Sequence, residues 1–319
     1  MSTTNPISTA ELRGLGLSTS DIAALRTTGE LTRLRRSMYA RGLPDDESAR
    51  HLALIAATLP LVHHSNVLSH TSAALWHDLP VRRDALDHVT MTRVTAGHSS
   101  RSAQLHVRNT RLTEDEIAVL DGTRVTSPAR TVADLARTER PEWGVVAADA
   151  ALRLGHSRDD VVDILDLHPR LNGRRKAKKV LAFADPLSES PAESVSRYNM
   201  ALAGLPPPEL QRELFDPDGE FIARVDFCWP EHGLVGEVDG KSKYGALLRP
   251  GQSADDVIMA EKRREGGIRG IGYWVVRWDW RVAVDPEALR RVVGQGLDRS
   301  TSLNARNLPR TGGFLSGGR

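Results

Sequence analysis

Acidic residues interrupt two runs of this chain that otherwise look like buried strands. In the run 221–229 (FIARVDFCW), alternate apolar residues from 221 to 227 share one face by the two-residue period of a strand, which places Asp226 on the other. In the run 234–239 (LVGEVD), Glu237 and Asp239 share a face. If the two strands pair, three carboxylates converge, and such an arrangement is unfavourable unless a cation lies between them. A hard divalent cation with oxygen ligands, such as Mg²⁺, is therefore the candidate occupant.

A predicted helix further along the chain carries charged residues on its apolar face. Glu261 and Arg264 fall at helical spacing with Val257, Ile268 and Ile271, so the stripe should face the sheet. Charges on such a face persist when they pair with one another or bind a metal or substrate. The pattern favours either an ion pair between Glu261 and Arg264 or a functional site shared with the carboxylates of the strands.

The elements that would position these side chains lie in a predicted domain covering residues 185–300. Ser190 and Pro191 are helix-start signals, and turn residues separate the strand-like runs that follow. The predicted order is helix, three strands, helix and strand, an αβββαβ core within an α+β protein. The predicted elements are a helix to about 203, strands at 209–215, 221–229 and 234–239, a helix at about 254–271 and a strand at 273–278. For residues 301–319 we expect a disordered tail.

Residues 8–44 are predicted to form a winged-helix unit that binds DNA. Ser18 and Asp21 supply cap chemistry for a short helix that ends near Gly29, and residues 31–42 have the pattern of a hairpin. The basic side chains of this hairpin would neutralise phosphates without reading sequence. They are Arg33, Arg35, Arg36 and Arg41. The alternative is a solvated basic turn on a small helical domain.

Residues 45–184 are predicted to form a mixed and helical region between these two domains. Helical patterns occur at 45–58 and 70–76, and residues 88–93 and 104–109 alternate like strands. From Ser127 and Pro128, which are helix-start residues, the pattern is helical throughout to 184.

Composition narrows the class of protein. The chain has 319 residues, with 43 Lys and Arg against 41 Asp and Glu, so local basic patches matter more than the net charge. Cys228 is the only cysteine, which excludes an internal disulfide and a multi-cysteine zinc site and suits a reducing compartment. The N-terminus lacks an apolar signal core, and the longest apolar run, 52–62, is too short to span a bilayer. We therefore expect a soluble cytoplasmic protein with no membrane partner.

Two resemblances to known families follow from these motifs. Residues 188–280 resemble the PD-(D/E)xK nuclease fold in its very-short-patch-repair-endonuclease-like branch. This resemblance rests on the strand with Asp226 and on the segments 237–240 (EVDG), 261–264 (EKRR) and 272–278 (GYWVVRW). Residues 8–155 resemble an AbiEi-type antitoxin region. The second resemblance rests on the hairpin and on the segments 69–74 (SHTSAA) and 126–134 (TSPARTVAD).

The nuclease resemblance implies roles for several side chains. Asp226 and Glu237 would hold Mg²⁺, which generates hydroxide from a bound water and polarises a phosphoryl oxygen. Glu193 matches an acidic residue that many family members place near the metal, whereas Asp239 stands where the family has a lysine. An aspartate cannot stabilise a developing anion as an ammonium group does. The side chains that would complete the catalytic set are Lys241 as the preferred replacement, with Lys243 and Lys262 as alternatives, and Glu261.

Three hypotheses for function result. The first is a DNA-binding, magnesium-dependent endonuclease that hydrolyses phosphodiester bonds. The alternative is an antitoxin-like transcriptional regulator whose nuclease-fold domain is catalytically inactive and whose partners would be DNA and a cognate toxin. The third is a purely structural interaction protein with an ion-paired core.

Overall fold

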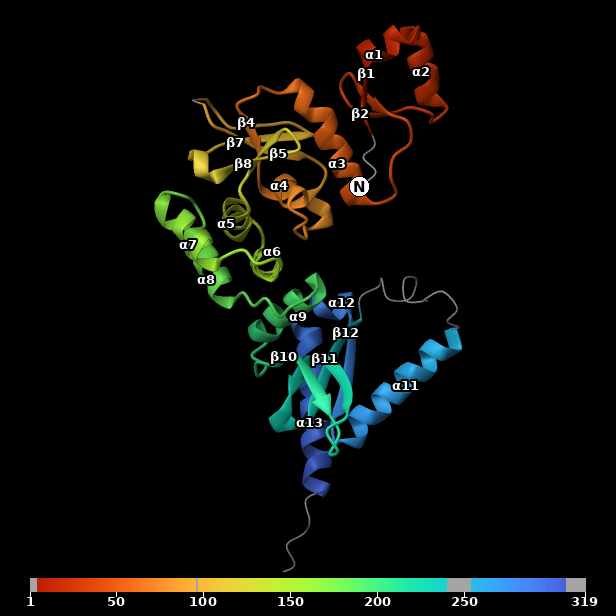
Figure 1. Ribbon diagram of the computed structural model, residues 1–319, viewed down its shortest axis with the longest axis vertical. Helices are drawn as coiled ribbons and strands as arrows, with labels where there is room; N and C mark the ends of the chain where they lie inside the picture. The colour runs from red at the N-terminus through yellow and green to blue at the C-terminus, as the bar shows by residue number, and fades with distance from the viewer. Residues whose placement is uncertain (1–4, 96, 240–253, 308–319) are drawn as a thin grey trace, which may run out of the picture. The chain divides into compact units, whose positions relative to one another are not determined.

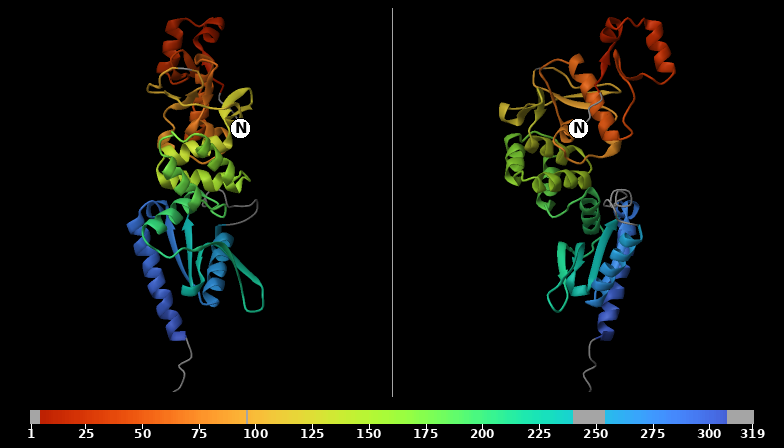
Figure 2. Two further views of the ribbon diagram at one scale, coloured as in Figure 1. Left: turned by 90° about the vertical axis from the view of Figure 1, so that its left-hand side faces the viewer. Right: turned by 45° about the vertical axis from the view of Figure 1, so that its right-hand side comes forward.

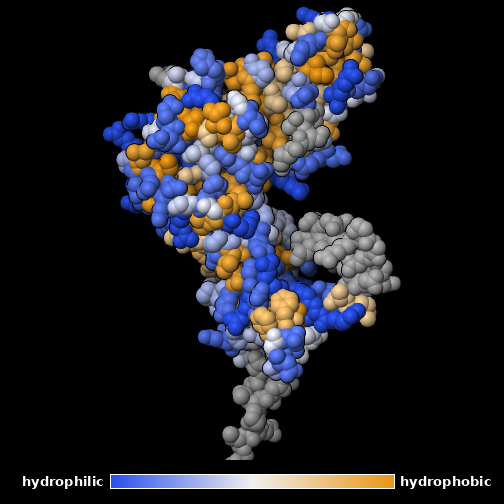
Figure 3. Space-filling model, viewed as in Figure 1, coloured by the Kyte–Doolittle hydropathy of each residue, from blue (hydrophilic) through white to orange (hydrophobic). Residues whose placement is uncertain are grey.

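A computed structural model describes residues 5–95, 97–239 and 254–307, without the side chains of residues 254–258 and 303–307. The chain divides into two compact units, residues 1–186 and 187–319 (Figure 1). Both units combine helices with β-sheets, so the protein belongs to the α+β class. Hydrophilic residues predominate on the face of each unit seen in Figure 3, and they separate smaller hydrophobic patches.

The first unit begins with two short helices and a small antiparallel sheet of order β1-β3-β2. Ser18 and Asp21 form a capping box at the start of α2, and Gly29 beyond its end has φ +80°, so the predicted helix is confirmed. The predicted hairpin is also confirmed, since β2 and β3 pair antiparallel around a turn at Ser37, whose φ is +64°. The elements are β1 (Ile7–Ser8), α1 (Thr9–Gly14), α2 (Thr19–Thr27), β2 (Thr32–Arg35) and β3 (Met38–Ala40).

A six-stranded mixed sheet of order β6-β7-β5-β4-β9-β8 follows in the same unit. Helix α3 starts at its cap Asp46 and packs against this sheet and the hairpin, burying Ala53 and Ile55. The predicted helix at 70–76 is confirmed, and the two predicted strands form β5 and β7, which pair in parallel. The elements are α3 (Glu47–Thr58), β4 (Asn66–Leu68), α4 (His70–Trp76), β5 (Val89–Arg93), β6 (Ser100–Arg101), β7 (Leu105–Asn109), β8 (Ile117–Leu120) and β9 (Thr123–Thr126).

Four helices complete the first unit, as the helical pattern from 127 predicts. Ser127 caps α5, and Pro128 occupies its first turn. Helix α5 contacts α4, α6, α7 and α8, so it is the central helix of this group (Figure 2). The helices are α5 (Pro128–Thr138), α6 (Pro141–Arg153), α7 (Arg158–Leu167) and α8 (Arg174–Phe183).

In its described residues, the second unit has the predicted order of helix, three strands, helix and strand. Its sheet has the order β10-β11-β12-β13, with β12 and β13 parallel and the other pairs antiparallel. Two further helices, α12 and α13, follow the last strand, and the sequence patterns above did not identify them. The elements are α9 (Pro191–Leu202), β10 (Glu209–Phe215), β11 (Phe221–Trp229), β12 (Leu234–Asp239), α11 (Ala254–Gly270), β13 (Trp274–Asp279), α12 (Trp280–Ala283) and α13 (Pro286–Asn307).

Helices cover both faces of this sheet. One face packs against α9, α12 and α13 and carries Phe227 and Trp278, whereas the other packs against α11 through Ile268. Ala223 and Val225 lie on the α11 side and Phe227 on the opposite side. The expectation that these three share a face is therefore wrong, because the alternation of β11 breaks at Asp226.

The break in β11 coincides with an irregularity in the neighbouring strand. Gln211 of β10 has φ +50°, and the register between β10 and β11 skips the position where Gln211 would face Asp226. A non-glycine residue with positive φ is uncommon, and it changes the direction of the strand locally. At this break, the Asp226 carboxylate accepts the backbone N–H of Val238 in β12 at 3.0 Å.

Helix α13 also changes the expected boundary of the C-terminal tail. It runs to Asn307, so residues 301–307, for which we expect disorder, are helical, and residues 308–319 lie outside the described residues. Leu289 and Val293 are buried one helical turn apart and anchor this helix to the sheet. Within the described ranges, no helix is both long enough and apolar enough to cross a membrane.

Candidate nucleic-acid interface and carboxylate cluster

The basic hairpin presents most of its arginines to solvent. The side chains of Arg33, Arg36 and Arg41 are exposed, and buried Leu34 and Met38 on the same strands anchor the hairpin against α3. Exposed guanidinium groups on a rigid hairpin can bind phosphate oxygens through paired N–H donors. The hairpin is therefore a candidate nucleic-acid interface.

Arg35 differs from the other arginines of the hairpin. It is partly buried, and its Nε and Nη1 atoms are buried without a hydrogen-bond partner. Burial lowers the pKa of its guanidinium. Its backbone carbonyl accepts a bond from Arg33 Nε at 3.3 Å, so Arg35 also supports the turn.

In the second unit, the carboxylate of Glu237 is held by two arginines. Arg264 of α11 donates to Glu237 Oε1, and Arg277 of β13 donates to Glu237 Oε2 at 3.0 Å. Arg277 also binds Glu265 at 2.8 Å and Glu261, while Arg264 lies 3.3 Å from Glu261. The i, i+3 ion pair considered from the sequence thus exists as part of a larger network that joins the sheet to α11.

The two arginines keep the carboxylate of Glu237 in its charged form. Glu237 is buried, which alone would raise the pKa of its carboxyl, but the hydrogen bonds and charges of Arg264 and Arg277 outweigh burial and lower that pKa. The same contacts raise the pKa of both guanidinium groups against the effect of burial. Glu237 is therefore an ionised structural partner at neutral pH.

Asp226 and Glu193 form a second acidic neighbourhood. Asp226 Oδ2 accepts the backbone N–H of Val238 at 3.0 Å, which ties β11 to β12 where their ladder ends. Glu193 accepts bonds from the Glu189 N–H at 2.9 Å, from the Ser190 hydroxyl at 2.7 Å and from Gln211 Nε2 at 2.8 Å. Burial raises the pKa of Glu193, and the charge of Asp226 adds to this effect.

Of the other predicted catalytic residues, Glu261 belongs to the Glu237 network, and the rest are exposed or lie outside the described residues. Asp239 is exposed at the end of β12, and Lys262 is exposed on α11. Glu261 is 46% exposed and binds arginines. Lys241 and Lys243 fall in the segment 240–253, which lies outside the described residues.

In this arrangement, the bonds that Glu237 and Asp226 already make compete with a magnesium ion. Both oxygens of Glu237 are occupied by guanidinium groups, and one oxygen of Asp226 binds a backbone N–H. Among the described residues, no group of three or more His, Cys, Asp or Glu side chains could hold a metal ion. Mg²⁺ is a hard cation that prefers oxygen ligands. The guanidinium groups of Arg264 and Arg277 beside Glu237 would repel it.

The first unit contains a buried ion-pair network that the patterns above did not identify as a site. Arg130 is fully buried and binds Glu116 at 2.8 Å and Asp134 at 3.1 Å. Asp134 also binds Arg137 at 2.7 Å, and His168 lies 2.8 Å from Glu116. Arg130 and Asp134 belong to the segment 126–134 that carries the antitoxin resemblance, so that motif builds the core of α5 and its connections. The i, i+4 pair of Arg130 and Asp134 in a predicted helix is the signal that could have indicated this network.

Part of the chain matches a known family. Residues 66–183 match the family model for the AbiEi antitoxin C-terminal domain. Two proteins of Mycobacterium tuberculosis, the uncharacterized proteins MT2308 (strain CDC 1551 / Oshkosh) and Rv2248 (strain ATCC 25618 / H37Rv), are each 31% identical to this chain over 162 residues. The matched region is 46% of this chain, and the chain spans 59% of each of these relatives. The crystal structure of the Rv2827c protein from the same species aligns at 15% identity with a TM-score of 0.39, over 67% of this chain and 84% of that one.

Proposed function

We propose that this protein is a DNA-binding regulator of the antitoxin type, with DNA and a cognate toxin protein as its partners. The observation that carries the proposal is that the first compact unit contains both a match to an antitoxin domain and an exposed basic hairpin. Residues 66–183 match an antitoxin domain, and the hairpin that precedes them exposes Arg33, Arg36 and Arg41. The hairpin would hold DNA by its phosphates, since exposed arginines supply affinity and register.

The second unit has a non-catalytic role in this proposal. The bonds from Arg264 and Arg277 to Glu237 attach α11 to the sheet and occupy the carboxylate that would otherwise bind a metal. Magnesium-dependent cleavage by Asp226 and Glu237 is the rival hypothesis. The closeness of Asp226 to buried Glu193, whose pKa is raised, is the feature that favours it.

Binding of duplex DNA from the region upstream of the gene tests the regulator. We expect binding by the full chain without magnesium, with an affinity that falls steeply as salt increases. The triple variant Arg33→Ala, Arg36→Ala, Arg41→Ala removes three phosphate contacts, so the slope of log K against log salt should decrease by about 2.7. The matched control replaces Arg175, Arg281 and Arg291, which are exposed elsewhere in the chain. Equal affinity and slope for the two triple variants would show that the hairpin does not contact DNA.

A nuclease assay separates the two hypotheses for the second unit. The wild-type chain and the variant Asp226→Asn are incubated with plasmid and with linear duplex DNA, with Mg²⁺ or with a chelator. The regulator predicts no cleavage under either condition. Magnesium-dependent cleavage that the wild type performs and Asp226→Asn loses would establish the nuclease instead.

A further inference from the structure

A cleft in the first unit carries an excess of positive charge. It has a volume of about 700 Å³ and is lined by the end of β7, the C-terminal turn of α5 and the connection between α7 and α8. Four arginines line it, and its described lining contains no carboxylate. The cleft is a separate surface from the basic hairpin, because no hairpin residue lines it.

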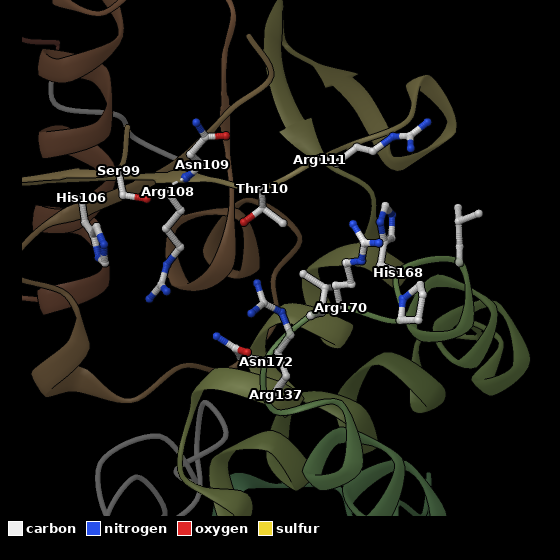
Figure 4. A pocket seen from close by; sticks show the side chains of 13 residues that line it. Ser99, His106, Arg108, Asn109, Thr110, Arg111, Arg137, His168, Arg170 and Asn172 are labelled. Atoms are coloured by element: carbon white, nitrogen blue, oxygen red, sulfur yellow. Dashed lines mark hydrogen bonds between the residues drawn. The ribbon is translucent and has the colours of Figure 1, made fainter. Parts of the chain in front are cut away.

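Arg108 is a cleft arginine with a buried donor that lacks a hydrogen-bond partner. It is partly buried, and its Nε atom is buried without a hydrogen-bond partner. Burial and the charge of Arg137 lower the pKa of its guanidinium, and the charges of Asp134 and Glu139 oppose this shift only in part. Figure 4 shows the ends of Arg108 and Arg137 pointing toward each other from opposite sides of the cleft. Asp134 already binds Arg137, so an anion between the two guanidinium groups would serve chiefly to balance the charge of Arg108.

The buried ion-pair network fixes Arg137 at the wall of the cleft. Asp134 binds Arg137 at 2.7 Å and is itself held by Arg130 at 3.1 Å. Asp134 and Glu116 balance the charges of Arg130 and Arg137, which leaves the charges of Arg108, Arg111 and Arg170 without a carboxylate in the cleft. A cation that is already positioned binds an anion with little loss of side-chain entropy.

The connection between α7 and α8 lies closely against the end of α5. Gly173 has φ +81°, and a Cβ atom at this position would lie 2.3 Å from the carbonyl oxygen of Arg137. Glycine is therefore required for the connection to pack here. This packing brings Arg170 and Asn172 to the same cleft as Arg108.

The chemistry of the lining selects the class of ligand. Guanidinium groups bind phosphate through paired, charge-assisted hydrogen bonds. The lining also offers polar uncharged groups on Asn109, Thr110 and Asn172, which can bind a sugar or base. A volume of about 700 Å³ lies within the range of roughly 300–1,000 Å³ found for small-molecule sites. We propose that this cleft binds the phosphate groups of a small ligand of nucleotide size.

Calorimetric titration of the full-length protein tests this site. The probes are pyrophosphate, ATP, adenosine and a short single-stranded DNA oligonucleotide. We expect pyrophosphate and ATP to bind and adenosine not to bind, because the phosphates supply the contacts. Arg108→Gln and Arg170→Gln should each weaken ATP binding about tenfold or more, the effect of losing a charge-assisted hydrogen bond. Arg175→Gln, an exposed arginine of α8 outside the lining, is the matched control and should bind like the wild type.

A thermal-unfolding measurement without ligand separates binding from a structural role. Removing the charge of Arg108 relieves its repulsion with Arg137, so the Tm of Arg108→Gln should equal or exceed that of the wild type. A large fall in Tm for Arg108→Gln, together with unchanged ATP binding by Arg170→Gln, would assign Arg108 to structure and overturn the proposal.

Two further outcomes would overturn the site. One is the absence of binding by both pyrophosphate and ATP. The other is Arg108-dependent binding of the oligonucleotide without binding of either small probe, because the phosphates would then come from a nucleic-acid strand. The hairpin triple variant should bind ATP like the wild type, because no hairpin residue lines the cleft. Failure of the cleft proposal can therefore be told apart from failure of DNA binding by the hairpin.

Discussion

Glu237 in the sheet, which the sequence predicts to be a metal ligand, forms an ion pair with Arg264 of helix α11. Arg264 is 29% exposed and the Glu237 side chain 10%, so solvent screens the pair only in part. The carboxylate of Glu237 also binds Arg277, so Glu237 is the central anion of the network. The predictions below begin with this contact.

The variant Glu237→Gln should destabilise the second unit. It leaves Arg264 and Arg277 beside a neutral amide, and breaking a fully buried pair costs about 3–5 kcal/mol. Partial exposure of both arginines reduces the expected loss to about 1–3 kcal/mol in the free energy of unfolding. Urea unfolding followed by tryptophan fluorescence measures it, since four tryptophans lie in this unit.

The control for this variant is Glu231→Gln, at an exposed position in the same unit. It should change the free energy of unfolding by less than about 0.5 kcal/mol. Equal stability of the two variants would mean that the Glu237 network contributes nothing to the fold.

Magnesium should have no effect on the stability of the protein. The Glu237 oxygens already accept hydrogen bonds from two guanidinium groups, so a cation would have to displace them. Thermal unfolding with millimolar Mg²⁺ and with EDTA should give the same Tm. A magnesium-dependent rise in Tm that Asp226→Asn abolishes would instead establish a metal site at the carboxylates.

The first unit should lose stability as the pH falls from 7 to 5. Burial lowers the pKa of His70 to about 3, and the charge of Asp134 only partly opposes this. His70 is therefore neutral at pH 7, and its contact with Asp134 at 3.7 Å is not an ion pair there. Because the unfolded pKa is 6.5, the unfolded chain binds more protons between pH 6.5 and 3 than the folded one, so stability decreases through this window.

Titration of His70 alone should lower the free energy of unfolding at pH 5 by about 2 kcal/mol relative to pH 7. The variant His70→Asn removes this contribution while keeping a residue that tolerates the positive φ of 53°. Unfolding by urea at the two pH values should show a smaller difference for the variant than for the wild type. An equal difference would contradict a buried neutral His70.

The variant Gly173→Ala should destabilise the first unit by more than backbone strain explains. A positive φ costs an alanine about 1–2 kcal/mol, and the added methyl group would also collide with the Arg137 carbonyl. The control is Gly155→Ala, where φ is +89° but no atom lies within 4 Å of the new Cβ. The difference in the free energy of unfolding between the two variants measures the collision, and equal values would show that the connection moves away without cost.

Local signals in the sequence determined the elements of this protein. Ser18 with Asp21, and Ser190 with Pro191, specify where α2 and α9 begin because capping involves residues only a few positions apart. The hairpin and the element order of the second unit to β13 follow from period and turn residues, which are also local. Helix α13 was not identified from the sequence, although Leu289 and Val293 have the spacing of a helix face.

Tertiary structure decided which partners the charged side chains bind beyond the Glu261–Arg264 pair, which helical spacing suggests. The sequence placed Glu237 among acidic residues, but its partners are Arg264 and Arg277, 27 and 40 residues away along the chain. The break in strand alternation at Asp226 depends on the conformation of Gln211 in another strand. The cleft arginines come from three separate elements. Strand register and helix packing select such contacts over long distances in sequence, and these are set by the whole core and not by neighbouring residues.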